Sequence, residues 1–231
     1  MPNLTTLRLL GEDSKEEIHS TLNAEASSLQ VKTLKLEGEI VRCPTLASSH
    51  QLVDALCSMP NLTTLRLLGE DSKEEIHSTL NAEASSLQVK TLKLEGEIVR
   101  CPTLASSHQL VDALCSMPNL TELTLQGKDF QEEFYSTLNA KASTLQVKTL
   151  RLLDVRCPTS ASSHHLVDAF FPTSTSTHHF VDALCSMPNL TELILHAKDF
   201  QEEFYSTLNA KASTLQVKTL RLRGVRCPTS A

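Results

Sequence analysis

The sequence has no tryptophan, and aromatic residues make up only 4% of its 231 residues. Proteins that hold single-stranded nucleic acid stack its bases on aromatic side chains, so this class of function is disfavoured. The chain has 21 basic and 27 acidic residues, and its net charge of −6 argues against nonspecific nucleic-acid binding as well. It lacks an apolar run of about 18 residues, and no basic stretch followed by an apolar one opens it. We therefore expect neither a membrane span nor a signal peptide.

Motifs that carry enzyme or metal chemistry are missing too. The chain contains no G-x-x-x-x-G-K-[ST] phosphate-binding loop and no C-x-x-C pair. Ser78 and Thr79 directly follow His77 on one expected helix, so they do not form a nucleophile–base pair with an orienting acid. Glu74 and Glu75 fit the first turn of that helix, where acidic residues favour the positive end of the helix dipole. We therefore predict no catalytic residues, no metal site and no cofactor.

An internal repeat dominates what is present. Residues 1–58 recur without change as 59–116, and the unit returns in diverged form from Met117 and from Met187. A fixed period of this length is typical of stacked repeat arrays, which bury their core as a stripe and present a long surface to other macromolecules. We predict a single array over residues 1–231, made of four double units, and a binding protein rather than an enzyme.

Each unit holds two strand–helix segments. The first begins Leu4-x-x-Leu7-x-Leu9 and the second begins with Val31 in the same pattern. The alternation predicts a short strand with one buried face. Capping-box spacing predicts the start of the following helices at three kinds of position, namely Ser14–Glu17, Ser48–Gln51 and Asp129–Glu132. Eight strands are expected to start near Leu4, Val31, Leu62, Val89, Leu120, Val147, Leu190 and Val217.

This pattern resembles the leucine-rich repeat family, whose consensus is L-x-x-L-x-L-x-x-N/C. Alternating repeats of 27 residues (Leu4 to Val31) and 31 residues (Val31 to Leu62) are most similar to the ribonuclease-inhibitor-like subclass. The resemblance implies an α/β solenoid, a horseshoe with short parallel strands on the concave face and helices on the convex face. One feature departs from the family and leaves the curvature open, because the consensus asparagine or cysteine is replaced in every repeat. The replacing residues are Glu12, Glu39, Glu70, Glu97, Lys128, Val155, Lys198 and Val225.

The joint between units resembles the repeats of NLR-type (NACHT–LRR) innate-immune sensors. It reads Leu-Cys-Ser-Met-Pro-Asn-Leu-Thr-x-Leu at 56–65, 114–123 and 184–193. The resemblance implies a cytoplasmic protein-recognition array that holds a protein ligand on its concave face. Met1 corresponds to a residue inside this joint, and no polar cap is recognisable at either end. We therefore expect the chain to be continuous with other domains of a longer protein.

A short duplication interrupts the third unit. Residues 158–171 are followed by a near copy at 172–185, offset by 14 residues. Fourteen residues cannot hold another strand and helix, so we predict an irregular insertion over 158–185 on the convex side. Its Ser/Thr-rich starts suit a loop and a helix cap.

Seven cysteines fall at two recurring positions, before a proline and at the end of a helix. Copies lie in alternate repeats, about 10 Å apart, which is beyond the reach of a disulfide. The odd count and the absence of a signal peptide indicate reduced cytosolic thiols that serve as small buried hydrophobes. Metal binding with the histidines at 164–165 and 178–179 is the alternative.

The candidate binding face follows from the strand alternation. The middle residue of Leu7-x-Leu9 points away from the core, and this column is basic in six of the eight repeats. The column contains Arg8, Lys35, Arg66, Lys93, Thr124, Arg151, Ile194 and Arg221. The next outward column contains Leu10, Glu37, Leu68, Glu95, Gln126, Leu153, His196 and Arg223. Either the basic residues pair with neighbouring glutamates, or basic and leucine side chains form a stripe for a partner with acidic and apolar groups.

Two copies within the chain indicate where change is tolerated. Residues 117–161 and 187–231 differ at five positions, all in or directly after the expected strands. The differences are Thr124/Ile194, Gln126/His196, Gly127/Ala197, Leu153/Arg223 and Asp154/Gly224. Such confinement is typical of a recognition surface, with drift as the alternative explanation. The candidate binding residues are Arg8, Lys35, Arg66, Lys93, Thr124, Gln126, Arg151, Leu153, Ile194, His196, Arg221 and Arg223.

A second hypothesis places binding on the helices. A structural or adaptor protein, such as a ribonuclease-inhibitor-like protein or a ubiquitin-ligase substrate adaptor, would bind through its convex side. The duplicated segment near His164 and His178 would then contribute to the contact.

Overall fold

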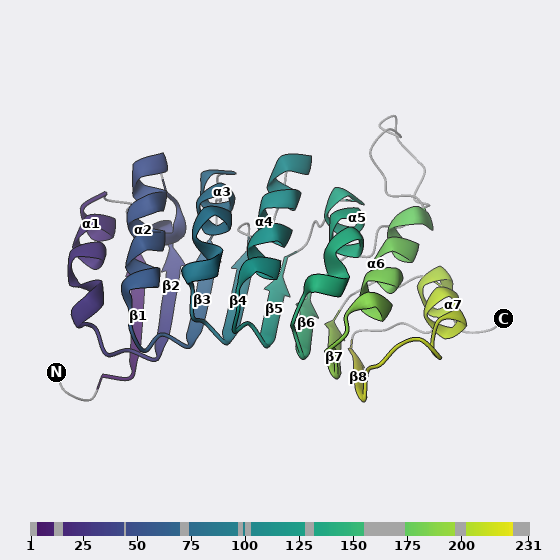
Figure 1. Cartoon of the computed structure of the whole chain (residues 1–231). Coiled ribbons are helices and arrows are strands. Elements are labelled where there is room, and N and C mark those ends of the chain that lie inside the picture. Colours follow the sequence, from purple (N-terminus) through teal and green to yellow (C-terminus); the bar gives the residue numbers. More distant parts are fainter. Residues whose placement is uncertain are drawn as a thin grey trace.

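The computed structural model describes residues 4–11, 16–43, 45–69, 74–96, 99, 103–127, 132–154, 174–196 and 202–223. Eight parallel strands form one sheet in which each strand pairs with its neighbour in the sequence (Figure 1). The strands are β1 Thr6–Gly11, β2 Thr33–Gly38, β3 Thr64–Gly69, β4 Thr91–Gly96, β5 Glu122–Gln126, β6 Thr149–Leu153, β7 Glu192–His196 and β8 Thr219–Arg223.

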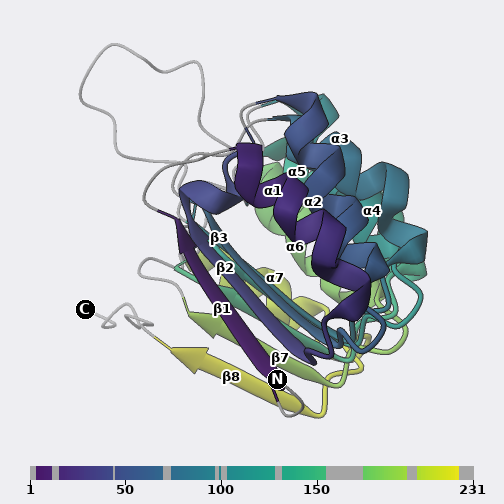
Figure 2. The same cartoon turned by 90° about the vertical axis from the view of Figure 1, so that its left-hand side faces the viewer.

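The helices pack against one side of this sheet and leave its other side open (Figure 2). They are α1 Glu16–Glu25, α2 Leu46–Ser58, α3 Glu74–Glu83, α4 Leu104–Ser116, α5 Glu132–Lys141, α6 Ser174–Ser186 and α7 Glu202–Ala210. The predicted α/β solenoid, with parallel strands on one side and helices on the other, is confirmed. Of the predicted insertion over 158–185, residues 158–173 lie outside the described part, and residues 174–185 of its second copy lie in α6.

The core is a stripe between the sheet and the helices. Inward strand leucines such as Leu34 and Leu36 meet helix residues such as Leu52 and Leu56, and all four are buried. In the last two units, aromatic residues form a cluster on the helix side of the core. The first two units have isoleucine, histidine and leucine at these positions. Ring centroids in this cluster lie 5.4–6.1 Å apart, which is within the range of favourable aromatic contacts. Its members are Phe134, Tyr135, Phe180, Phe204 and Tyr205.

Each strand begins two residues after the first apolar residue of its motif. Val31 is buried, yet β2 starts at Thr33. The N–H groups of Lys32 and Thr33 both donate to the carbonyl oxygen of Thr5, at 2.9 and 3.0 Å. The chain bends into the sheet at this shared acceptor, so the first apolar residue packs beneath the bend rather than inside the strand.

The predicted helix start at Ser48 is wrong. Helix α2 begins at Leu46, and the hydroxyl of Thr45 accepts a bond of 3.2 Å from the N–H of Ser48. Ser49 lies within the helix and donates its hydroxyl to the carbonyl of Thr45, four residues earlier, so a serine can be buried there. Thr103 caps α4 in the same way. The other two predicted starts rest on Ser14 and Asp129, which lie outside the described residues.

The two end strands of the sheet leave apolar side chains open. Leu220 of β8 is 41% exposed, whereas Leu65 at the equivalent position of β3 is fully buried. In the outer column, Leu10 of β1 is 67% exposed, whereas Leu68 of β3 is half-buried. This contrast follows from stacking, because a repeat buries its apolar face only against a neighbour. No helix among the described residues has the length and apolarity to cross a bilayer.

Candidate functional site on the strand face

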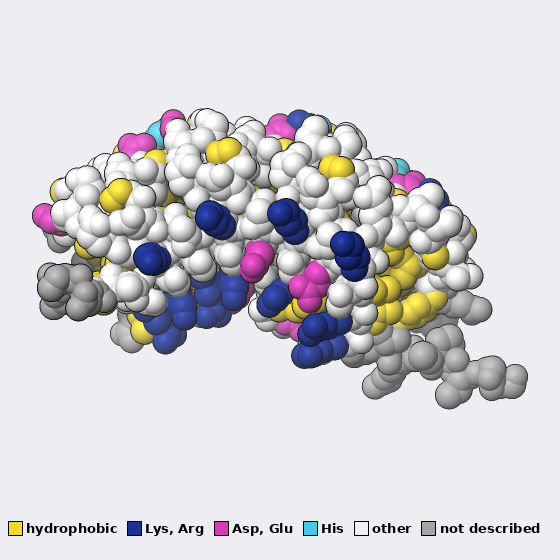
Figure 3. All heavy atoms as spheres, turned by 60° about the horizontal axis from the view of Figure 1, so that its bottom comes forward, with side chains coloured by type: hydrophobic (Ala, Val, Ile, Leu, Met, Phe, Trp, Pro, Cys, Tyr) yellow, Lys and Arg dark blue, Asp and Glu magenta, His cyan; other side chains and the backbone are white. Residues whose placement is uncertain are grey.

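The parallel register aligns equivalent residues of every repeat into columns on the open face of the sheet, and Figure 3 shows that this side of the molecule is hollowed. We call two of these columns the central and the outer column. The central column contains Arg8, Lys35, Arg66, Lys93, Thr124, Arg151, Ile194 and Arg221. The outer column contains Leu10, Glu37, Leu68, Glu95, Gln126, Leu153, His196 and Arg223. Every candidate residue predicted from the sequence therefore lies in one of two adjacent rows.

Two glutamates of the outer column are buried beneath arginines of the central column. The side chains of Glu37 and Glu95 are only 7% and 11% exposed. Arg8 donates to Glu37 at 2.5 Å, and Arg66 donates through Nε and Nη2 to Glu95 at 3.0 and 2.5 Å. Nη1 of Arg66 lies 3.5 Å from Glu37, so this one guanidinium spans both carboxylates. For Arg8 and Arg66, the charge-pairing interpretation is the correct one.

These ion pairs shift the pKa values of Glu37 and Arg66. The hydrogen bond from Arg8 is the largest influence on Glu37 and lowers the pKa of that carboxyl, with help from the charges of Arg8, Arg66 and Lys35 and against the effect of burial. The hydrogen bond to Glu95 raises the pKa of Arg66. Both side chains are therefore charged at neutral pH and hold each other in place.

Three other basic residues of the central column have no ion pair among the described residues. No carboxylate of the described residues lies within 4.0 Å of the side-chain nitrogens of Lys35, Lys93 or Arg151. All three are half-buried in the sheet surface. Arg221, at the end of the column, lies 3.7 Å from Glu192. The same face thus combines arginines held by buried carboxylates with three cations that have no carboxylate in direct contact among the described residues.

A polar cluster that the sequence did not indicate occupies the second half of the outer column. Gln126 donates to Oδ2 of Asp154 at 2.7 Å, and Nδ1 of His196 lies 3.8 Å from Oδ1 of the same carboxylate. Asp154 has a φ of 57°, a left-handed conformation that aspartate tolerates better than most residues. Gly38 and Gly96 occupy the equivalent position in earlier repeats. One sequence feature could have revealed this cluster. Residue 154 is aspartate where the earlier repeats have glycine, and this change adds a carboxylate to the strand face.

A third column of the face was also missed by sequence reasoning. It runs along the first residue of each strand, where six threonines and two glutamates align. Its members are Thr6, Thr33, Thr64, Thr91, Glu122, Thr149, Glu192 and Thr219. It borders the central column on the side where the strands begin.

The cysteines at the helix ends serve the packing of helices. The thiol of Cys57 in α2 contacts the carbonyl oxygen of Glu83 in α3 at 3.9 Å. Cys115 makes the same contact with Lys141 at the end of α5, and Cys185 makes it with Lys211 directly after α7. Burial, followed by the charges of Glu83 and Asp54, raises the pKa of Cys57 to about 11. Burial also raises the pKa of Cys115. The thiols of Cys57 and Cys115 are protonated at neutral pH. The described residues contain no group of three His, Cys, Asp or Glu side chains placed to hold a metal ion.

We expect Glu83→Lys to raise the free energy of unfolding by about 0.5–1 kcal/mol, the range of a well-placed surface pair. Later repeats have lysine at this helix position, and Lys141 pairs with Asp112 just as Lys211 pairs with Asp182. The equivalent residues here are Glu83 and Asp54, two carboxylates that both act on Cys57. Urea unfolding measures the gain, and the pH dependence of Cys57 alkylation should show a lowered thiol pKa.

Glu25→Lys is the matched control for this substitution. Glu25 ends α1 at the same repeat position, and no helix precedes α1 in the described part of the chain to supply the aspartate. An equal gain from both substitutions would mean that the net charge, and not the missing ion pair, sets the effect.

Comparison with known proteins supports the fold. No family model and no curated protein matches the sequence. Among solved structures, the chain is similar to the crystal structure of the leucine-rich repeat-containing protein LegL7 from Legionella pneumophila, with a TM-score of 0.55 and 16% sequence identity. The similarity covers 94% of this chain and 64% of the LegL7 chain, so this chain spans less than two thirds of that structure. The fold is therefore that of a leucine-rich repeat solenoid.

Proposed function

We propose that this protein is a non-enzymatic interaction array that holds a protein ligand on its strand face. The supporting observation is the contrast within the central column. Buried glutamates neutralise Arg8 and Arg66, whereas Lys35, Lys93 and Arg151 have no carboxylate within 4.0 Å among the described residues. A partner that supplies carboxylates to these three positions would complete the charge pattern of the face.

The spacing of these cations defines what such a partner presents. Lys35, Lys93 and Arg151 lie on alternate strands, so their backbones are separated by about 10 Å, twice the distance between paired strands. The half-buried side chains of Leu68 and Leu153 stand beside them in the outer column. The partner surface therefore carries acidic groups about 10 Å apart, with apolar side chains between them.

The positions that differ between copies lie together on β5 to β8. Thr124 and Ile194, Gln126 and His196, and Leu153 and Arg223 are aligned on four neighbouring strands. This half of the face contains the cluster around Asp154, whereas β1 to β4 contain the arginine–glutamate pairs. We propose that β5 to β8 determine which partner is bound and that the cations of the central column contribute general attraction.

Sequence motifs support a proposal about the subclass of leucine-rich repeat protein. The Leu-Cys-Ser-Met-Pro-Asn-Leu joint and the alternating repeat lengths support a ribonuclease-inhibitor-like array of an NLR-like innate-immune sensor. In such a protein the array acts in the cytosol and is covalently continuous with other domains. The proposed partner is a protein, with neither nucleic acid nor membrane as the main target.

The test reverses the charge of the unpaired cations only. We expect Lys35→Glu, Lys93→Glu and Arg151→Glu together to weaken binding of the partners captured from cytosol by at least about tenfold. Arg8 and Arg66 are left unchanged, because they hold buried carboxylates and their loss would destabilise the fold. Quantitative affinity capture measures the effect, and circular dichroism checks that the variant remains folded.

A convex variant with the same number of added acids serves as the control. His50→Glu, His108→Glu and His178→Glu place new carboxylates on exposed positions of α2, α4 and α6. This variant should retain its partners. If the convex variant releases them while the strand-face variant keeps them, the protein binds through its helices as an adaptor.

A further inference from the structure

A second row of lysines runs along the edge of the sheet where the strands begin, separate from the central column. We call Lys32, Lys90, Lys148 and Lys218 the edge row. Figure 3, which brings this edge forward, shows lysine and arginine side chains in a line along it. All four lysines are exposed, and no carboxylate of the described residues lies within 4.0 Å of their ammonium groups. On a chain with more acidic than basic residues, the edge row is a line of cations with no carboxylate in direct contact among the described residues.

Backbone hydrogen bonds fix the spacing of the edge row. The N–H of each lysine donates to a threonine carbonyl of the preceding repeat at 2.8–2.9 Å. The carbonyl of Lys32 then accepts from the N–H groups of Thr63 and Thr64, both at 2.9 Å, and from the hydroxyl of Thr63 at 3.2 Å. Lys90 and Lys148 repeat this arrangement with the following repeat. The lysine backbones are therefore held two strand spacings apart, or about 9.4–9.8 Å.

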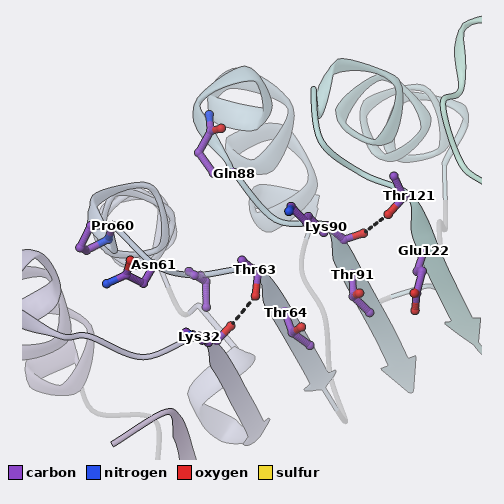
Figure 4. A pocket seen from close by; sticks show the side chains of 11 residues that line it. Lys32, Pro60, Asn61, Thr63, Thr64, Gln88, Lys90, Thr91, Thr121 and Glu122 are labelled. Atoms are coloured by element: carbon purple, nitrogen blue, oxygen red, sulfur yellow. Dashed lines mark hydrogen bonds between the residues drawn. The ribbon is translucent and has the colours of Figure 1, made fainter. Parts of the chain in front are cut away.

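The surface between two lysines of the row is hollowed. A hollow of about 580 Å³ lies between Lys32 and Lys90, and Figure 4 shows the threonines of β3 and β4 on its floor. The side-chain bond from Asn61 to Gln30, at 2.6 Å, lies on one flank. The odd repeats have threonine where the even repeats have lysine, so a small side chain separates each pair of cations. This edge can receive a chain that runs along it from one lysine to the next.

We propose that the edge row binds an extended acidic polypeptide segment with a carboxylate at every third residue. A polyproline II helix has three residues per turn and a rise of about 3.1 Å per residue, so its equivalent side chains recur about every 9.3 Å on one face. This repeat matches the two strand spacings between lysines. Disordered acidic segments sample this conformation readily, and a preformed extended chain loses little entropy on binding.

The lining of the hollow favours a peptide over a nucleic acid. Its described residues include no aromatic side chain on which a base could stack, since their side chains are those of proline, asparagine, leucine, threonine, glutamine, lysine and glutamate. Glu122 contributes a carboxylate to the same lining. A phosphate chain has a charge at every nucleotide and would be repelled there. A peptide with spaced acids can place an uncharged residue beside Glu122.

The test uses synthetic peptides and the whole chain. A labelled peptide of four Pro-Pro-Glu triplets is compared with a peptide of the same composition whose four glutamates are consecutive. We expect the spaced peptide to bind at least about fivefold more tightly in fluorescence anisotropy at about 0.05 M salt, where screening is weak. Replacing the whole edge row with alanine should weaken its binding at least tenfold, and Lys→Arg at the same positions should restore it to within about threefold.

The control replaces Lys35, Lys93, Arg151 and Arg221 of the central column with alanine, which changes the net charge equally. The affinity of this variant for the spaced peptide should stay within about threefold of the wild-type affinity. This result separates the present proposal from the one made for the strand face. Equal binding of both peptides would overturn the proposal, because only general charge attraction would be at work. Tighter binding of an oligothymidylate of equal charge, lost in the edge-row variant, would overturn it in favour of a nucleic acid.

Discussion

Replacing Arg66 with methionine is expected to lower the free energy of unfolding by about 2–3 kcal/mol. The guanidinium of Arg66 bonds to Glu95 through two nitrogens and lies 3.5 Å from Glu37, so its removal leaves two nearly buried carboxylates with one cation fewer. Breaking a fully buried pair costs about 3–5 kcal/mol, and we take a smaller figure because the Arg66 side chain is 31% exposed and partly screened by water. Methionine keeps most of the aliphatic contact, and urea unfolding at pH 7 measures the difference.

Lys93→Met is the matched control for this prediction. Lys93 occupies the same column on the next strand and has no carboxylate within 4.0 Å among the described residues. Its loss should change stability by no more than about 0.5 kcal/mol, as is usual for a surface position. Equal losses in the two variants would show that the buried glutamates do not depend on Arg66.

The pH dependence of stability offers a check on the same ion pairs. The pKa of Glu37 is lowered in the folded protein from an ordinary value of 4.5. Its contribution to stability is therefore fully present above pH 4.5 and is lost as the pH falls through the lower folded pKa, because the unfolded chain binds the proton first. Stability of Glu37→Gln should fall less steeply over this acid range.

Gly38→Ala and Gly96→Ala are each expected to cost about 2–3 kcal/mol. Gly38 has φ 77° and ψ −146°, a region that only glycine adopts without strain. A Cβ atom on Gly38 would lie 2.6 Å from the carbonyl oxygen of Gly11, and one on Gly96 would lie 2.4 Å from that of Gly69. Both contacts are with backbone atoms of the neighbouring strand, so the sheet itself has to shift. Urea unfolding of the two single variants measures the cost.

Asp154→Gly provides the comparison at the equivalent turn after β6. Aspartate already adopts a positive φ of 57° there, and glycine relieves that strain while the bond from Gln126 is lost. These effects oppose each other, so the change should stay below about 1 kcal/mol. Wild-type stability in Gly38→Ala would mean that the strand ends can rearrange without cost.

The number of strands, their parallel pairing and the composition of the central and outer columns could all be derived from the sequence. A strand alternates its faces with a period of two, and the repeat places equivalent residues on neighbouring strands. Leu7 and Leu9 therefore pack inward and Arg8 outward in every copy of the motif, whatever the details of the loops. The sequence also contains the alternation of leucine and glutamate in the outer column, although it does not show which cation each glutamate meets.

The pairing of charges was decided by the tertiary structure. Arg8 reaches diagonally to Glu37 on the adjacent strand, and Arg66 spans the glutamates on both sides of its own strand. Lys35 and Lys93 lie on the same strands as the two glutamates and have leucine or glutamine in the outer column of the adjacent strands. They remain unpaired among the described residues. A planar guanidinium with several donors can bond to two carboxylates at once, whereas an ammonium group is a single point of charge. Whether a cation is paired therefore depends on side-chain geometry that the aligned repeat sequences do not show.

The exact first residues of the helices and strands could also be determined only from the structure. Both Thr45 and Ser48 are suitable N-cap residues, and the helix takes the earlier one because Ser49 can be buried by bonding to the carbonyl of Thr45. Strand alternation would place Lys32 on the core side, because Leu34 faces inward two residues later. The bend at the shared carbonyl of Thr5 instead leaves Val31 buried and turns Lys32 to solvent. The edge row therefore exists because two N–H groups share one acceptor at the start of each even-numbered strand, a contact between repeats that only the folded stack creates.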